Sequence, residues 1–197
     1  MSKTRELENI AKEIASCKVC PTLCKTAINP VPGEGNPDAE IMFIGEAPGA
    51  EEDRQGRPFV GASGQFLESM LEAIGLRRSD VFITNIVKYR PPGNRDPLPE
   101  EIKACWPWLE RQINTIKPKI IGLLGRYAMN IFLPGLQISK CHGQPKRKGE
   151  LIFLPLYHPA VALYNANMRT VLQEDFARIP VILKQTKSKF KQSKLLI

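Results

Sequence analysis

The chain lacks any long apolar run, and its first residues lack the apolar stretch of a signal peptide. Its uninterrupted apolar segments are only a few residues long, whereas a membrane-spanning helix needs about 20. The segment from Met1 to Glu6 is mostly polar or charged, unlike a secretory leader. We therefore expect no membrane span and a cytoplasmic protein.

Acidic residues and histidines are also scarce. The sequence has 28 Lys and Arg against 20 Asp and Glu, a net charge of +8, and only 2 His. A positive excess favours a polyanionic partner such as nucleic acid. With 197 residues, of which 43% are hydrophobic and 24% charged, the chain is long enough for one globular domain with a sizeable core.

Apolar runs alternate with helical patterns along the chain. Runs that predict buried strands occur at 40–45, 81–87, 119–124 and 151–157. Helical spacing occurs at 4–16, 63–75, 99–116, 126–133 and about 168–186. Continuously apolar strands belong to a parallel sheet that is covered on both faces. We expect an α/β fold, a three-layer α/β/α sandwich around a central, mostly parallel four-stranded sheet.

We expect one domain over residues 1–186, because no internal repeat or linker interrupts it, and a basic tail over 187–197. The lysines near the C-terminus suit either a solvated end or an arm that contacts nucleic-acid phosphates. The last residues, Gln192 to Ile197, faintly resemble a sliding-clamp-binding tail, but they lack its anchoring aromatic pair.

The most informative stretch follows the first predicted strand. A turn containing Glu46 leads into the acids of 51–53 and then to Phe59. Parallel sheets bind ligands at the carboxyl ends of their strands, and Asn85 and His158 lie at the ends of two other predicted strands. Each residue taken singly has a structural alternative: Asn85 could cap a turn, and His158 and Phe59 could be core residues. Their joint placement at strand ends indicates a site.

Three segments resemble the family 4 uracil-DNA glycosylases, the iron–sulfur type of archaea and thermophilic bacteria. They are GEAPGAEEDRQGRPFVGASGQFL at 45–67, TNIVKYRPPGNRDP at 84–97 and HPA at 158–160. The resemblance extends from Cys17 to about Ile182. It implies the α/β/α fold and the excision of uracil, the product of cytosine deamination, from single- and double-stranded DNA.

The resemblance also implies roles for the site residues. Phe59 would stack on a flipped-out base, and Asn85 would pair with O4 and N3–H of uracil. His158, as a neutral imidazole, would donate a hydrogen bond to O2 of the departing uracil anion. Glu46 would position or activate the attacking water, and Glu52 would exclude the methyl group of thymine. The other substrate-binding positions are Gly45, Ala47 and Gly49.

The segment after His158 resembles the loop by which the family wedges into the minor groove. Its expected DNA-binding residues are Ala160, Leu163 and Tyr164. Leu163 or Tyr164 would fill the hole that the flipped base leaves; the alternative is that both pack onto the last helix. The short segment after Arg90 contains no His, which favours plain hydrolytic excision over the covalent chemistry of related families.

Five cysteines are present, and the family holds a [4Fe–4S] cluster with four. Cys17 and Cys20 match the N-terminal pair and Cys105 matches a helix ligand, but Tyr89 stands where the remaining Cys is usual. We expect Cys24 to complete the set, as tight Cys triplets do ligate clusters. Alternatives are a three-Cys cluster or Zn²⁺ with a non-Cys ligand, or no metal. Cys141 is expected in the core.

Three rival functions stay open: a silent module that only binds damaged DNA, an electron-carrying iron–sulfur protein, and an enzyme that also accepts other deaminated bases. The first two leave unexplained why Glu46, Phe59, Asn85 and His158 are all present. We expect a nucleoid-associated monomer that acts on DNA.

Overall fold

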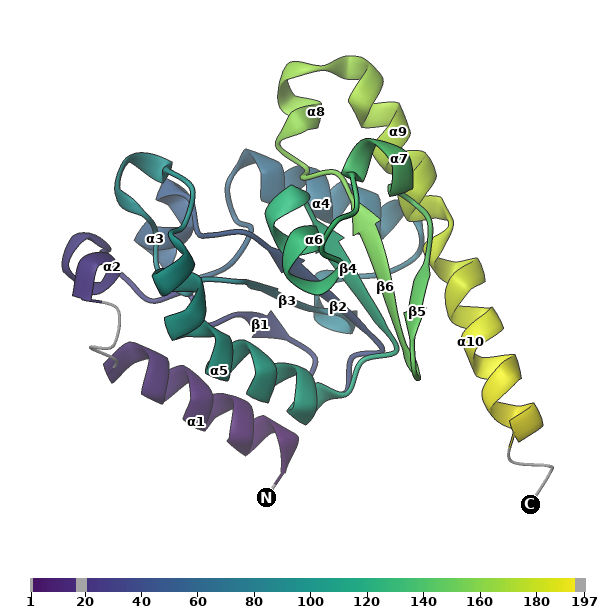
Figure 1. The fold of residues 1–197 in the computed structure, drawn as a ribbon, viewed down its shortest axis with the longest axis horizontal. Helices are drawn as coiled ribbons and strands as arrows, with labels where there is room; N and C mark the ends of the chain where they lie inside the picture. Colours follow the sequence, from purple (N-terminus) through teal and green to yellow (C-terminus); the bar gives the residue numbers. More distant parts are fainter. Residues whose placement is uncertain (1, 17–20, 194–197) are drawn as a thin grey trace.

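A six-stranded sheet runs through the middle of the molecule (Figure 1). The computed structural model describes the backbone of residues 2–16 and 21–193, and side chains over 2–16 and 23–186. The strand order is β1-β3-β2-β4-β6-β5. The four central strands are parallel: β3 (Phe82–Asn85), β2 (Ile41–Gly45), β4 (Ile120–Leu124) and β6 (Leu151–Leu156). They confirm the mostly parallel sheet.

The prediction of four strands was incomplete, because each edge carries one further antiparallel strand. β1 (Glu34–Gly35) pairs with β3, and β5 (Lys146–Lys148) pairs with β6. Both are very short and polar, so neither has the apolar run by which the central strands were recognised. Charged, short edge strands also protect a sheet from pairing with other chains.

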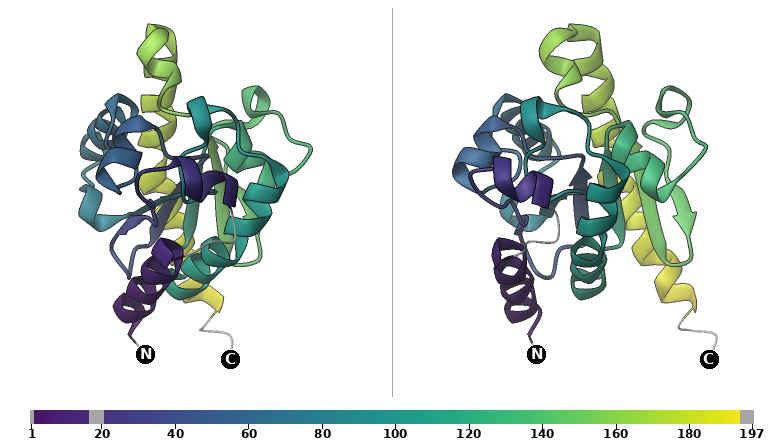
Figure 2. Two further views of the ribbon diagram at one scale, coloured as in Figure 1. Left: turned by 90° about the vertical axis from the view of Figure 1, so that its left-hand side faces the viewer. Right: turned by 60° about the vertical axis from the view of Figure 1, so that its left-hand side comes forward.

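Helices cover both faces of the sheet, as Figure 2 shows from two further directions. One core contains Met42 and Ile44 of β2, and the opposite core contains Ile41 and Phe43 of the same strand. This alternation places every second side chain on the same face. The helices of the first face are α1 (Lys3–Ser16), α5 (Pro99–Ile116), α6 (Arg126–Phe132) and α7 (Ile138–Cys141). Those of the second are α4 (Ala62–Ala73), α9 (Ala166–Ala177) and α10 (Ile179–Ser193).

The helix predicted at 168–186 is in fact two, since α9 ends at Ala177 and α10 begins at Ile179. Pro180 stands in the first turn of α10, where its missing N–H costs nothing. α10 continues to Ser193, so most of the predicted basic tail has a helical backbone. None of the described helices is both long and apolar enough to cross a membrane.

Short elements connect these layers near the ends of the strands. They are α2 (Pro21–Thr26), α3 (Ala50–Gln55), α8 (Val161–Tyr164) and the 3₁₀ turns η1 (Arg78–Asp80) and η2 (Pro92–Asn94). Figure 1 shows α8 beyond the carboxyl end of β6. The carboxyl ends of the parallel strands are therefore surrounded by loops and short helices rather than covered by a long one.

A fully buried lysine holds the end of β3 in place. Lys88 Nζ donates to Thr84 Oγ1 at 2.7 Å, to the Asn85 carbonyl at 2.8 Å and to Gln112 Oε1 at 2.8 Å. Gln112 Nε2 in turn donates to the Pro32 carbonyl at 2.7 Å. Burial lowers the pKa of Lys88 to about 7, but three acceptors match the three N–H bonds of an ammonium group. The network ties β3 to α5 and to the segment before β1.

Replacing Lys88 with Met should lower the free energy of unfolding by about 2–4 kcal/mol, because three buried oxygens lose their donor. Chemical denaturation measures this difference. The matched control is Lys103→Met on the exposed side of α5, the helix that carries Gln112; this variant should stay within about 0.5 kcal/mol of the wild type. Equal stabilities for the two variants would contradict the role given to the Lys88 network.

Candidate functional site

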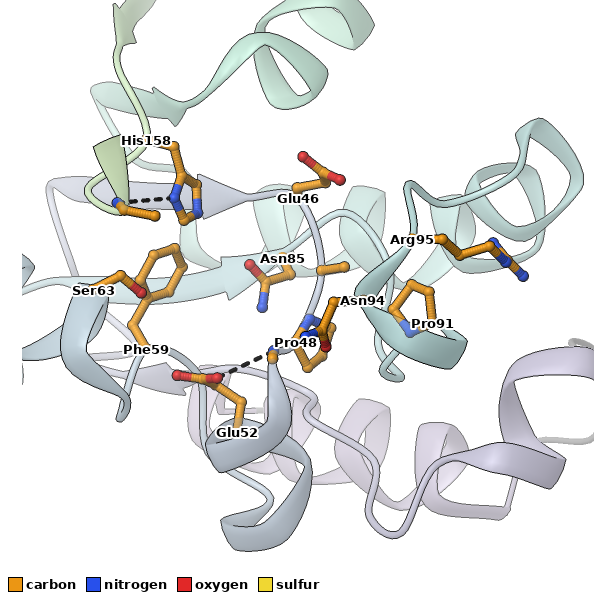
Figure 3. Close-up of a pocket in the computed structure, with 13 residues that line it drawn as sticks. Glu46, Pro48, Glu52, Phe59, Ser63, Asn85, Pro91, Asn94, Arg95 and His158 are labelled. Atoms are coloured by element: carbon orange, nitrogen blue, oxygen red, sulfur yellow. Dashed lines mark hydrogen bonds between the residues drawn. The ribbon is translucent and has the colours of Figure 1, made fainter. Parts of the chain in front are cut away.

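A pocket of about 360 Å³ opens at the carboxyl ends of the central strands. It is lined by Glu46, Glu52, Phe59, Asn85 and His158, the five side chains that the sequence placed in one site (Figure 3). Asn85 ends β3, and the other four come from the segments that follow β2 and β6. The pocket also includes Ala47, Gly49 and Ala160 in its walls.

Gly45 is the last residue of β2 and lies against the floor of this pocket. A Cβ atom at this position would stand 2.4 Å from Asn85 Oδ1 and 2.6 Å from Cζ of Phe59. Both distances are far below van der Waals contact, so only glycine lets the Asn85 amide and the Phe59 ring approach this strand end. Gly45 therefore shapes the pocket without contributing a side chain.

Asn85, the last residue of β3, is 1% exposed. Among the buried side-chain oxygens and nitrogens of the described residues, its Oδ1 alone has no hydrogen-bond partner. Figure 3 shows the amide in the middle of the pocket. A buried acceptor without a partner is costly and calls for a donor from a ligand.

His158 presents a hydrogen-bond donor to the pocket. The backbone N–H of Ala160 donates to Nδ1 of His158 at 3.2 Å, so a neutral ring carries its proton on Nε2. Burial lowers the pKa of His158 to about 4, although the negative charge of Glu52 opposes this. At neutral pH the ring is therefore uncharged, and its Nε2–H is available to a ligand.

Glu46 follows β2 directly and is partly buried. Burial raises the pKa of Glu46 to about 7, with the charge of Asp96 adding to the rise and Arg126 opposing it. A carboxyl group that is half ionised near neutral pH suits a general base. Glu46 and His158 also line a neighbouring cavity of about 270 Å³, which Asp96 and Arg126 border.

Glu52 has a structural task that the sequence analysis did not predict. Its Oε1 accepts hydrogen bonds from the backbone N–H groups of Val60 and Gly61, both at 2.8 Å. Its Oε2 accepts one from Gly49 at 3.1 Å. The carboxylate thus joins the first turn of α3 to the loop that carries Phe59. Its spacing of three residues from Gly49 is that of a capping residue, which was the available signal.

The loop after β3 contributes pocket residues to which sequence reasoning gave no role: Pro91, Asn94 and Arg95. The Arg95 guanidinium donates to both carboxylate oxygens of Glu101, at 2.9 and 2.6 Å. Glu101 is fully buried in the first turn of α5. This bidentate pair fixes one wall of the pocket to α5. The PPGNR segment stood out in the sequence as a loop, but nothing in its composition indicated that Arg95 pairs with Glu101.

Tyr164 and Leu163 lie on α8, outside the pocket wall. Tyr164 is 90% exposed and Leu163 is 40% exposed. This exposure disagrees with the alternative in which Tyr164 packs onto the last helix. Both side chains are available to a partner that approaches the pocket from the α8 side.

The cysteine site can be followed only in part, because Cys17 and Cys20 lie outside the described residues. Cys24 of α2 is partly buried, and Cys105 of α5 is fully buried in the same core. The described residues contain no group of three His, Cys, Asp or Glu that could hold a metal ion. Thiolates are the ligands that iron–sulfur clusters use, so the donor type fits such a group.

Tyr89, where the resemblance implies a cysteine ligand, is buried in the same core as Cys105. Its hydroxyl donates to the backbone carbonyl of Ile14 in α1. The loop after β3 is therefore tied to the N-terminal helix by a hydrogen bond. Cys141, as predicted, is a buried core residue, and its thiol lies 3.1 Å from the Gln137 carbonyl.

Comparison with known proteins agrees with this geometry. Residues 32–179 match the uracil DNA glycosylase superfamily. The chain is 51% identical over 183 residues to a type-4 uracil-DNA glycosylase of Sulfurisphaera tokodaii (88% of this chain, 83% of that protein). It is 48% identical over 182 residues to that of Archaeoglobus fulgidus (88% and 91%).

A type-5 uracil-DNA glycosylase of Thermus thermophilus is less similar, with 32% identity over 191 residues (81% of this chain, 86% of that protein). The match to the type-4 proteins is therefore the stronger one at comparable coverage. The chain belongs to the uracil-DNA glycosylase superfamily and, within it, to the type-4 uracil-DNA glycosylases.

Proposed function

We propose that this protein flips uracil out of DNA and hydrolyses its N-glycosidic bond, leaving an abasic site. The observation that carries the proposal is the unpartnered Oδ1 of Asn85, which lies in one pocket with an aromatic ring and a neutral histidine. A base inside a duplex is out of reach of any pocket, so the nucleotide must leave the stack at a cost of a few kcal/mol.

Asn85 and Phe59 would select the base. The amide offers both a donor and an acceptor, which match O4 and N3–H of uracil. Cytosine has an amino group and a bare N3 at these positions and would leave the buried amide mispaired. Phe59, whose ring lies 5.6 Å from that of His158, would stack on the flipped base. Glu52 would border the C5 position, where thymine carries its methyl group.

His158 would stabilise the leaving group. As the glycosidic bond lengthens, negative charge develops on the uracil ring, and Nε2–H of the neutral imidazole would donate to O2. A preorganised donor of this kind contributes about 3–4 kcal/mol to transition-state stabilisation. A neutral ring supplies it without a buried cation.

Glu46 would bind and deprotonate the water that attacks the sugar. Its raised pKa makes it a base of suitable strength near neutral pH. Its carboxylate would also stabilise the positive charge that develops on the sugar as uracil departs. The cavity lined by Glu46, His158, Asp96 and Arg126 supports this proposal, because it would leave room for the water and the sugar beside the base pocket.

DNA would approach from the side of α8. Leu163 or Tyr164 would enter the space that the flipped base leaves, which accounts for the exposure of Tyr164. We propose that the enzyme acts as a monomer on single- and double-stranded DNA in the nucleoid. The net charge of +8 supports attraction to the phosphate backbone. The final residues that faintly resemble a clamp-binding tail include 194–197, outside the described residues.

The Asn85→Asp variant tests base recognition. Its kcat/KM for uracil should fall roughly a hundredfold or more, because a carboxylate cannot donate to O4, and cytosine should begin to be excised. Oligonucleotides with one U, T, C or hypoxanthine, single- and double-stranded, are assayed for abasic product. Asn114→Asp, an exposed residue of α5, is the matched control. Unchanged selectivity in Asn85→Asp would refute the pairing role. If the wild-type protein binds these oligonucleotides but forms no abasic product, a silent DNA-binding module is favoured instead.

The pH dependence tests Glu46. If ionised Glu46 is the base, kcat/KM should rise about tenfold per pH unit below pH 7 and level off above it. His158, with its pKa near 4, stays neutral throughout this range. Asp96→Asn should move the rising limb to lower pH, because it removes a negative charge that raises the pKa of Glu46. Glu46→Gln should abolish the limb; a limb that survives in Glu46→Gln belongs to another group.

We also propose a structural [4Fe–4S] cluster held by Cys17, Cys20, Cys24 and Cys105. Cys24 and Cys105 adjoin the same core as Tyr89, which supports Cys24 as the replacement for the ligand missing at Tyr89. When bound, the cluster would cross-link the N-terminal segment to α5. The hydrogen bond from Tyr89 to Ile14 would hold the loop after β3 beside it.

Protein purified without oxygen should show broad visible absorption and contain iron. Cys24→Ser should lose both, because it removes one of four thiolate ligands. Cys141→Ser is the matched control, since Cys141 is a buried thiol elsewhere in the core, and it should retain both. Zinc in place of iron, or a Cys24→Ser variant that keeps the band, would contradict the assignment.

A further inference from the structure

The backbone of Phe59 adopts a conformation that a bulky residue rarely has. Its φ is +51°, in the left-handed region. Such a conformation persists only where surrounding contacts fix it. Phe59 is also the residue whose ring faces the base pocket. The contacts that hold this backbone therefore determine where the ring stands.

Two charged side chains bind the backbone of this loop. Glu52 accepts from the N–H groups that follow Phe59, those of Val60 and Gly61. On the carbonyl side, Arg78 Nη1 donates to the Phe59 carbonyl at 2.9 Å, and Nη2 donates to the Pro58 carbonyl. Four successive residues are thus held through their backbone. Arg78 binds the carbonyls of Pro58 and Phe59, and Glu52 binds the N–H groups of Val60 and Gly61.

Arg78 is itself held firmly. Its side chain is 15% exposed, and its Nε donates to Glu34 Oε1 at 2.6 Å. Arg57 donates to both oxygens of the same carboxylate, at 2.8 and 2.9 Å. Burial alone would raise the pKa of Glu34, but the hydrogen bonds from Arg57 and Arg78 outweigh it and the pKa is lowered. Glu34 therefore stays ionised and orients Arg78.

The start of α4 packs against the same loop. A Cβ on Gly64 would lie 1.9 Å from the Phe59 carbonyl oxygen, so α4 packs directly against this peptide. The close contact leaves no room for the loop to shift toward α4, and Arg78 satisfies the same carbonyl. The Phe59 backbone is thus enclosed by α4, Arg78 and Glu52.

We propose that Arg78, oriented by Glu34, is a positioning residue for base recognition: it holds Phe59 in the backbone conformation that points its ring into the pocket. The inference rests on the proposed function, in which Phe59 stacks on uracil. Arg78 lies outside the pocket wall and acts through Phe59. Losing it would let the loop relax and would weaken stacking without removing the ring.

A double-mutant cycle with Phe59→Ala tests this. Arg78→Met should lower kcat/KM for uracil excision about tenfold, a fraction of what base stacking contributes. Added to Phe59→Ala, the same substitution should change kcat/KM by less than about twofold, because the ring it positions is gone. Arg77→Met is the matched control: its side chain is 80% exposed and paired with Asp80, and it should change activity less than about twofold.

Assays are run well below the melting midpoint of every variant, so that lost stability does not enter the comparison. If Arg78→Met does not fold, Arg78→Lys replaces it; lysine keeps the charge but lacks the forked pair of donors. Arg78→Lys should lower kcat/KM by a smaller factor, and this effect should again vanish in the Phe59→Ala background. Equal losses in both backgrounds would overturn the positioning role. If Phe59→Ala alone leaves excision unchanged, the stacking role proposed for Phe59 fails instead.

Discussion

The site depends on the parallel pairing of β2 and β3, in which Gly45 lies opposite Asn85. This register places the two strand ends side by side, and the absence of a Cβ at Gly45 lets the Asn85 amide and the Phe59 ring share the space above it. The pairing continues past the strands, where the N–H groups of Ile86 and Val87 donate to the carbonyls of Gly45 and Glu46. A shift of one residue would point Asn85 to the opposite face of the sheet.

Burial gives two ionisable groups in this pocket opposite chemical roles. The same low polarity raises the pKa of Glu46 and lowers that of His158, because it disfavours the charged form of each. In the proposed mechanism, this gives a base of moderate strength and a neutral donor in one pocket, the combination that would suit hydrolysis with an anionic leaving group. Glu52 differs from Glu46 because three backbone N–H groups bind its carboxylate, which commits it to holding two loops together.

The sequence allowed the central sheet and the five pocket side chains to be predicted, because apolar strands and the residues that follow them are contiguous in the chain. The edge strands β1 and β5 could not be found, since they are short and polar and exist only through pairing with a neighbour. Arg78 was missed for a related reason. It is one of two adjacent arginines, and only the fold decides that Arg78 faces the Phe59 loop while Arg77 faces solvent.

Tyr89 stands where the resemblance to the family implies a cysteine, and it makes a different kind of contact there. The position lies just after β3, between buried Lys88 and the pocket loop. The Tyr89 hydroxyl ties this loop to the N-terminal helix through the Ile14 carbonyl. Because Lys88 fixes Asn85 from the strand side and Arg95 fixes the loop to Glu101, the base pocket is held by contacts within the chain.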